Sequence, residues 1–64
     1  MGRIRRGGYM IESWIGDHEP KHVHIYRDGR LIAKVEVPSL LILSGHMNRR
    51  LRRILEELLE EGRI

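Results

Sequence analysis

Cysteine is absent from this 64-residue sequence, as are glutamine and threonine, and Asn48 is the only asparagine. Without cysteine the chain can form neither disulfides nor zinc–thiolate sites. No apolar run approaches the ~18 residues that a membrane-spanning helix needs. The basic N-terminus lacks the following apolar stretch of a signal peptide. We therefore expect a cytoplasmic protein. Few amides with abundant Arg and Glu also fit a thermophile, which says nothing about function.

The length allows one small domain, residues 1–64. A domain of this size buries only about 60% of the surface that its unfolded chain exposes, so its stability is marginal. With disulfides excluded, the remaining supports are self-association, a metal held by histidine and carboxylate, or dense ion pairing.

Charge is unevenly distributed along the chain. Residues 1–53 carry eleven Lys/Arg and five Asp/Glu, which gives 11 − 5 = +6, and residues 54–64 carry one Arg and four Glu, which gives 1 − 4 = −3. A basic body indicates a polyanionic or acidic partner, although a charged solvent-exposed surface accounts for it equally well.

The pattern of residues predicts an α+β fold in the order β-β-β-α. Residues 1–8, with three arginines and three glycines, are expected to be a flexible basic arm. Aromatic and β-branched residues predict a three-stranded antiparallel sheet over residues 9–37. Residues 39–45 are expected to be an apolar linker that adds a short strand or a helical turn. A helix is predicted over residues 46–61, capped by Asn48 or Ser44 and ended by Gly62.

The turn between the second and third predicted strands decides which way the histidines face. A two-residue turn at Asp28-Gly29 would place them among the apolar residues of the next strand. A three-residue loop over residues 27–29 shifts the pairing by one and separates the two kinds of residue, so we favour it. The apolar side then holds Val23, Ile25, Leu31, Ala33, Val35 and Val37, and the other side holds His22, His24, Tyr26, Arg30, Ile32, Lys34 and Glu36.

The predicted helix carries its charges in an unfavourable order. Its first half contains RRLRR and its second half EELLEE, whereas the macrodipole favours acids first and bases last. One explanation is that Arg49, Arg50, Arg52 and Arg53 are placed to bind an anion, which could be RNA, DNA or an acidic protein. The other is that these arginines pair with acids elsewhere in the fold.

Three of the four histidines fall in the segment DHEPKHVHIY, residues 17–26. Residues two apart on a strand point the same way, about 6.6 Å apart, so His22 and His24 can act together. As a metal site they would bind zinc with His18 and an oxygen ligand from Asp17 or Glu19. As an acid–base site, His22, His24 and Lys34 would cleave RNA without a metal. A binding surface with Tyr26 and Arg30, or ordinary packing of half-buried histidines, stays open as well.

The segment DHEPKHVHIYRDG, followed by an apolar strand and the helix GHMNRRLRRILEEL, resembles the short bacterial proteins grouped as domain of unknown function 4160. The resemblance covers the chain from about residue 8 to residue 59. The residues that match its motif are Asp17, His18, Pro20, His22, His24, Arg49 and Arg50. The sequence departs from the motif at Lys21 and Val23, and neither change removes a candidate functional group. The resemblance implies a link to toxin–antitoxin modules and a small protein partner encoded nearby.

Together these observations predict a toxin–antitoxin-type module protein that binds or cleaves RNA. The catalytic candidates are His22, His24 and Lys34, and the candidates for binding RNA are Tyr26, Arg30, Arg49, Arg50 and Arg53. No cofactor is required by this interpretation. The alternative is a non-catalytic module that binds a protein partner, with or without a structural zinc on His18, His22, His24 and Asp17. In either case we expect a homo-oligomer.

Overall fold

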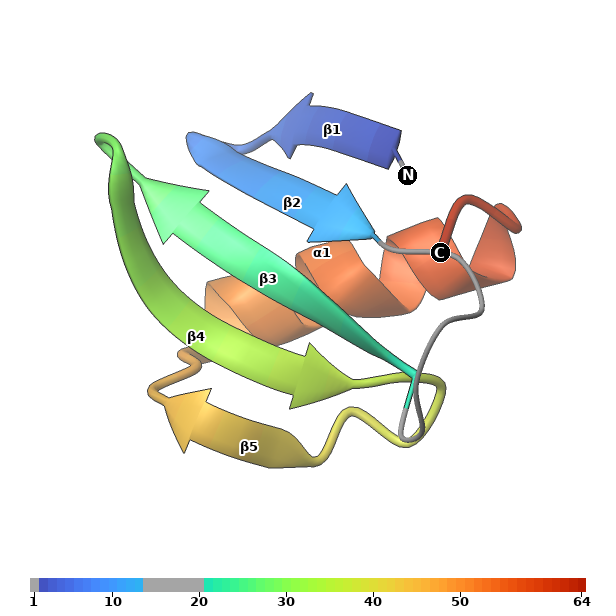
Figure 1. Cartoon of the computed structure of the whole chain (residues 1–64). Helices are drawn as coiled ribbons and strands as arrows, with labels where there is room; N and C mark the ends of the chain where they lie inside the picture. The colour runs from blue at the N-terminus through green and yellow to red at the C-terminus, as the bar shows by residue number, and fades with distance from the viewer. Residues whose placement is uncertain (1, 14–20) are drawn as a thin grey trace.

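The structure is a computed structural model that describes residues 2–13 and 21–64. One antiparallel sheet of five strands packs with one face against a single helix (Figure 1). The strands follow the chain order across the sheet. They are β1 (Gly2–Arg6), β2 (Tyr9–Ser13), β3 (His22–Arg27), β4 (Arg30–Glu36) and β5 (Ile42–Gly45), and they are followed by the helix α1 (Arg49–Glu60).

The predicted three-stranded sheet is therefore wrong, although the α+β class is retained. The segment expected to be a flexible arm forms β1, which pairs with β2 through the two-residue turn Gly7-Gly8. Both glycines have positive φ, 62° and 87°, as a tight turn between two strands requires. The apolar linker contributes the fifth strand, β5, which pairs with β4.

Glycine at position 45 allows β5 to lie close to its neighbour. Gly45 has φ 81°, and a Cβ built on it would lie 2.0 Å from the carbonyl oxygen of Ile32. No side chain larger than hydrogen fits there without moving the backbone of β4. The close approach of β5 therefore depends on this glycine.

The turn between β3 and β4 differs from the predicted loop, and the predicted separation of faces holds only from Ala33 onward, because Leu31 pairs with Tyr26 and is 46% exposed instead of buried. Arg27 pairs with Arg30 across a two-residue turn in which Asp28 and Gly29 have φ 52° and 77°. The pairing then shifts beside Ile25, and this bulge changes the alternation by one residue. Val23 consequently pairs with Val35 and Ile25 with Ala33 on the buried side.

The core lies between this side of the sheet and α1. Its members are Tyr9, Ile11, Val23, Ile25, Ala33, Val35, Val37, Leu40, Leu51, Ile54, Leu55 and Leu58, each no more than 7% exposed. The helical residues among them follow the predicted spacing of one apolar face. The Asn48 side chain caps α1 by accepting a hydrogen bond from the Leu51 N–H at 2.8 Å, as predicted.

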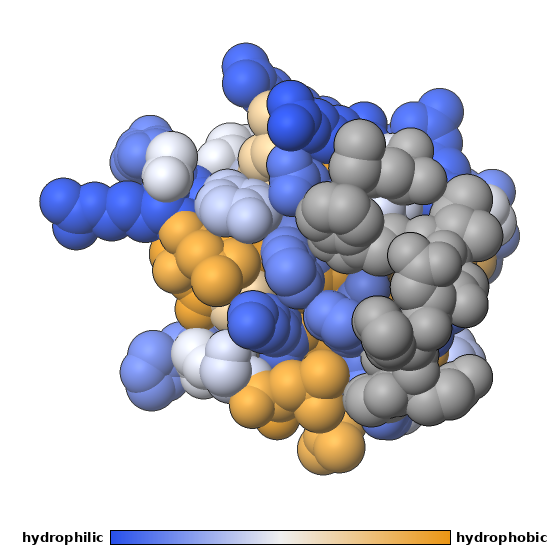
Figure 2. Space-filling model, in the orientation of Figure 1, coloured by the Kyte–Doolittle hydropathy of each residue, from blue (hydrophilic) through white to orange (hydrophobic). Residues whose placement is uncertain are grey.

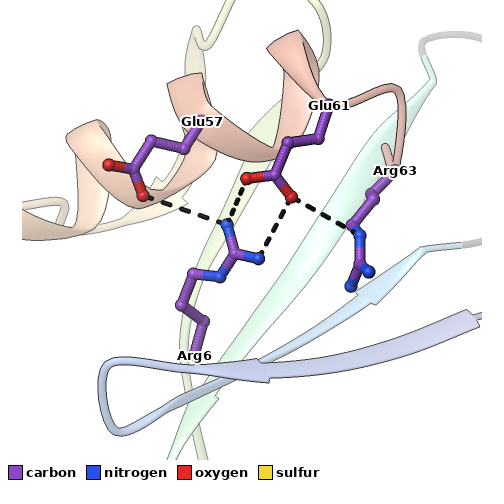
Figure 3. Close-up of polar contacts among 4 residues, drawn as sticks. All are labelled: Arg6, Glu57, Glu61 and Arg63. Carbon is purple, nitrogen blue, oxygen red and sulfur yellow. Dashed lines mark hydrogen bonds and ion pairs between the residues drawn. The ribbon is translucent and has the colours of Figure 1, made fainter.

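An ion-pair cluster joins the start of the chain to the end of α1 (Figure 3). The Arg6 guanidinium donates to both carboxylate oxygens of Glu61, at 2.9 and 3.1 Å. Glu57 and Arg63 lie at the edge of this cluster, 3.9 Å from Arg6 and 3.4 Å from Glu61. The acids at the carboxyl end of the helix thus pair with a strand arginine. This pairing explains the acids in the second half of the helix and leaves the arginines of its first half unexplained.

At twelve residues, α1 is the only helix in residues 2–13 and 21–64, and its ~18 Å length falls short of a bilayer core.

Candidate functional site

The face of the sheet that points away from α1, called the open face below, carries the histidine pair that the sequence singled out. Because side chains alternate along a strand, burial of Val23 and Ile25 against the helix turns His22, His24 and Tyr26 outward. Lys34 is the cross-strand partner of His24. Figure 2 views this face and shows hydrophilic side chains over its middle and hydrophobic ones at its lower edge, over β5.

The two histidines of β3 contact each other. The Nε2 atoms of His22 and His24 are 3.1 Å apart, and their ring centroids are 5.0 Å apart with the planes tilted by 32°. At this distance the two nitrogens share a hydrogen bond, so one of them carries the proton and the other accepts it. The pair therefore holds a donor and an acceptor against each other at one point of the open face.

The surroundings of His24 favour its neutral form. Burial lowers the pKa of His24 below its usual value, and the nearby charges of His22 and Lys34 lower it further, while Glu12 opposes the shift. These groups come from all three strands at the site, because Glu12 on β2 and Lys34 on β4 are the cross-strand partners of His24. A neutral imidazole can accept a proton near pH 7.

Two arginines of the open face were missed as site residues. Arg3 and Arg5 alternate with Ile4 on β1, opposite Glu12 and Met10. Arg3 forms an ion pair with Glu12 at 2.8 Å, in which the Glu12 side chain is only 14% exposed. The sequence did contain a signal for this strand, because Gly-Gly between two extended segments is a common hairpin turn.

The predicted binding arginines do not join the histidines on the open face. Arg49, Arg50 and Arg53 are exposed on α1, which covers the opposite side of the sheet. Arg30 pairs with Arg27, whose guanidinium lies 5.4 Å from the ring centre of buried Tyr9. The structure thus separates a histidine-bearing face from a basic helix surface.

Of the predicted metal ligands, Asp17 and His18 lie outside the described residues. In the described part of the chain, no cluster of three or more His, Cys, Asp or Glu residues is arranged to hold a metal ion. His22 and His24 are the predicted ligands that the structure does bring together.

Comparison with models of protein families identifies the family of this chain. The family model of the domain of unknown function DUF4160 matches residues 8–63, which is most of the sequence. The chain belongs to this family. The match includes the histidine pair, the Asp28-Gly29 turn and α1 of this DUF4160 protein. No curated protein and no solved structure matches it significantly.

Proposed function

We propose that this DUF4160 protein binds single-stranded RNA on its open face and cleaves it without a metal ion. The observation that carries the proposal is the 3.1 Å contact between the Nε2 atoms of His22 and His24. Cleavage of RNA needs one group that accepts a proton and one that donates it, and the contact places two imidazoles together that could share these roles. Lys34 and the exposed Arg3 and Arg5 supply positive charge on the same side.

The surroundings of His24 favour it as the base, and the proposal gives His22 the remaining role of acid. Neutral His24 takes the proton of the ribose 2′-hydroxyl, and the oxygen forms a bond to phosphorus as the bond from phosphorus to the 5′-oxygen breaks. Protonated His22 gives its proton to the leaving 5′-oxygen. Lys34 stabilises the charge that develops on the phosphoryl oxygens. The products are a 2′,3′-cyclic phosphate and a 5′-hydroxyl.

Substrate binding has to part the two rings. A phosphate cannot sit between nitrogens that are 3.1 Å apart, so in this proposal one imidazole rotates as RNA replaces the hydrogen bond between them. Catalytic hydrogen bonds often take their working geometry only when substrate is bound. Tyr26, two residues along β3, offers a half-buried ring on which a neighbouring base stacks.

The test is cleavage of a fluorescently labelled oligoribonucleotide in the presence of EDTA. His22→Gln and His24→Gln should each lower the rate by about 10²–10⁴-fold. His46→Gln is the matched control, because His46 is exposed in the segment before α1 and should leave the rate unchanged. An oligodeoxyribonucleotide of the same sequence should resist cleavage. Cleavage that both His22→Gln and His24→Gln retain would refute the proposal.

The toxin–antitoxin role is a further part of this proposal, supported by the family resemblance. Expression of the protein alone in a bacterial host should arrest growth, and co-expression of its neighbouring small protein should relieve the arrest. The His24→Gln variant should be harmless at equal expression. Growth that the unaltered protein does not affect would contradict the toxin role.

The same pair of histidines favours a second candidate function, a partner-binding module stabilised by zinc. Two nitrogens bound to one tetrahedral zinc at the usual ~2.0–2.1 Å lie about 3.3 Å apart, close to the observed 3.1 Å. Calorimetric titration with zinc should then show one ion per chain, and EDTA should lower the melting temperature. Cleavage that survives EDTA, without zinc binding, would exclude this candidate.

A further inference from the structure

A hollow of about 480 Å³ lies on the open face at the end where both tight turns meet. The cross-strand row of Arg5, Met10 and Tyr26 runs through it, and residues of the Gly7-Gly8 and Asp28-Gly29 turns complete its lining. Its volume lies within the ~300–1,000 Å³ of small-ligand sites. No residue pattern in the sequence pointed to this hollow, because a third of its lining comes from β1 and its turn.

The lining combines an apolar surface with charges of both signs. Tyr26 and Met10 are half-buried and offer an aromatic ring and a thioether, which suit a flat base. Arg5 and Asp28 are both exposed, and neither forms an ion pair within residues 2–13 and 21–64. The hollow therefore presents a cation for a phosphate and a carboxylate for a group with N–H donors.

We propose that this hollow binds one guanosine nucleotide, with Asp28 accepting hydrogen bonds from the base and Arg5 contacting the phosphate. Guanine has two adjacent donors, N1–H and the 2-amino group, which match the two oxygens of one carboxylate. Adenine, cytosine and uracil each place an acceptor beside their donor and would repel one carboxylate oxygen. A carboxylate at this position therefore selects guanine.

The position of the hollow connects it to the cleavage site. Tyr26 follows His24 by two residues on β3, so the row through the hollow lies about 6.6 Å from the imidazole pair. A guanosine bound in the hollow has its neighbouring phosphate near His22 and His24. This connection rests on the proposed cleavage of RNA, whereas binding of the nucleotide itself does not.

Asp28 can be changed without disturbing its turn. Its φ of 52° and that of Gly29, 77°, suit Asn-Gly as well as Asp-Gly, since asparagine tolerates the left-handed region. The variant Asp28→Asn thus removes one carboxylate and retains the shape of the hollow. A melting temperature no lower than that of the parent confirms that the turn is intact.

The test is titration of the full chain with 5′-GMP, AMP, CMP and UMP, followed by ¹H–¹⁵N NMR shifts. GMP should bind about tenfold or more tightly than the other three, in line with one bidentate contact. Asp28→Asn should remove this preference, and Arg5→Gln should weaken all four nucleotides while GMP remains the tightest. Equal affinities, no binding of GMP, or a preference that survives in Asp28→Asn would overturn the inference.

The outcomes separate this inference from the proposed function. Selective binding of GMP without cleavage of RNA would support the hollow as a guanosine site and refute the ribonuclease. Cleavage that is lost in His24→Gln but ignores guanine would support the ribonuclease and refute the guanosine site.

Discussion

Replacement of Gly45 by alanine tests how closely β5 approaches β4. The new methyl group would meet the Ile32 carbonyl oxygen at 2.0 Å and the Ala33 Cα at 2.8 Å. Both atoms belong to the backbone, so no side-chain rotation relieves the clash. A left-handed conformation costs an alanine about 1–2 kcal/mol, and overpacking adds about 1–3 kcal/mol. The expected total loss of stability is therefore about 2–5 kcal/mol.

Gly8→Ala is the control that isolates the clash. Gly8 also has positive φ, 87°, but a Cβ there meets nothing within 4 Å. It should lose only the conformational part, about 1–2 kcal/mol, or about 5–15 °C in melting temperature for a domain of this size. Thermal and urea denaturation followed by circular dichroism should show a loss about 1–3 kcal/mol larger for Gly45→Ala. Equal losses in the two variants would refute the close approach of β5.

Three further predictions follow from contacts described above. Asn48→Ala should lower the free energy of unfolding, measured by urea denaturation, by about 1–2 kcal/mol. The variant loses the helix cap and also the hydrogen bond that the Asn48 side chain donates to the Tyr9 hydroxyl at 3.2 Å. Asn48→Asp should retain the cap. Folding lowers the pKa of His24, so the unfolded chain binds more protons than the folded chain as the pH falls through the usual histidine pKa of 6.5. The free energy of unfolding should therefore decrease as the pH falls through this value. His24→Gln should make stability depend less on pH between about pH 8 and pH 5. The hydrogen bond from Arg6 lowers the pKa of Glu61. The stabilisation that this contact gives the fold is therefore present above the usual carboxyl pKa of 4.5 and is lost as the pH falls through the lowered pKa. When the stability is measured during acid titration, Arg6→Gln should lose less of it than the parent.

The parts of the fold that sequence could predict are those with a repeating apolar pattern. Alternation in β3 and β4 and the 3.6-residue period of α1 both reflect burial of one side, and all three elements were located. The flanking strands lack such a pattern. In β1, Ile4 is the only large apolar residue among arginines, and β5 is exposed throughout. Their pairing depends on neighbours that a local pattern does not reveal.

The predicted orientation of the histidines was correct for a different physical reason. A three-residue loop and a two-residue turn with a bulge beside Ile25 both turn His22 and His24 away from the apolar side. Alternation sets only the parity, so sequence could not separate the two geometries. It also could not place Arg3 and Arg5 beside the histidines, because that depends on β1 joining the sheet. The assignment of catalytic, RNA-binding and metal-binding roles to the predicted residues stays a prediction.

The two outer strands leave the sheet with unlike borders. β1 carries arginines along its length, whereas the chain at β5 leaves Leu41, Ile42 and Leu43 between 42% and 60% exposed. Charged side chains discourage the addition of another strand, and apolar ones permit it. A further strand can therefore join the sheet beside β5 and is discouraged beside β1. A second chain bound beside β5 would leave Arg3, Arg5 and Tyr26 open to solvent.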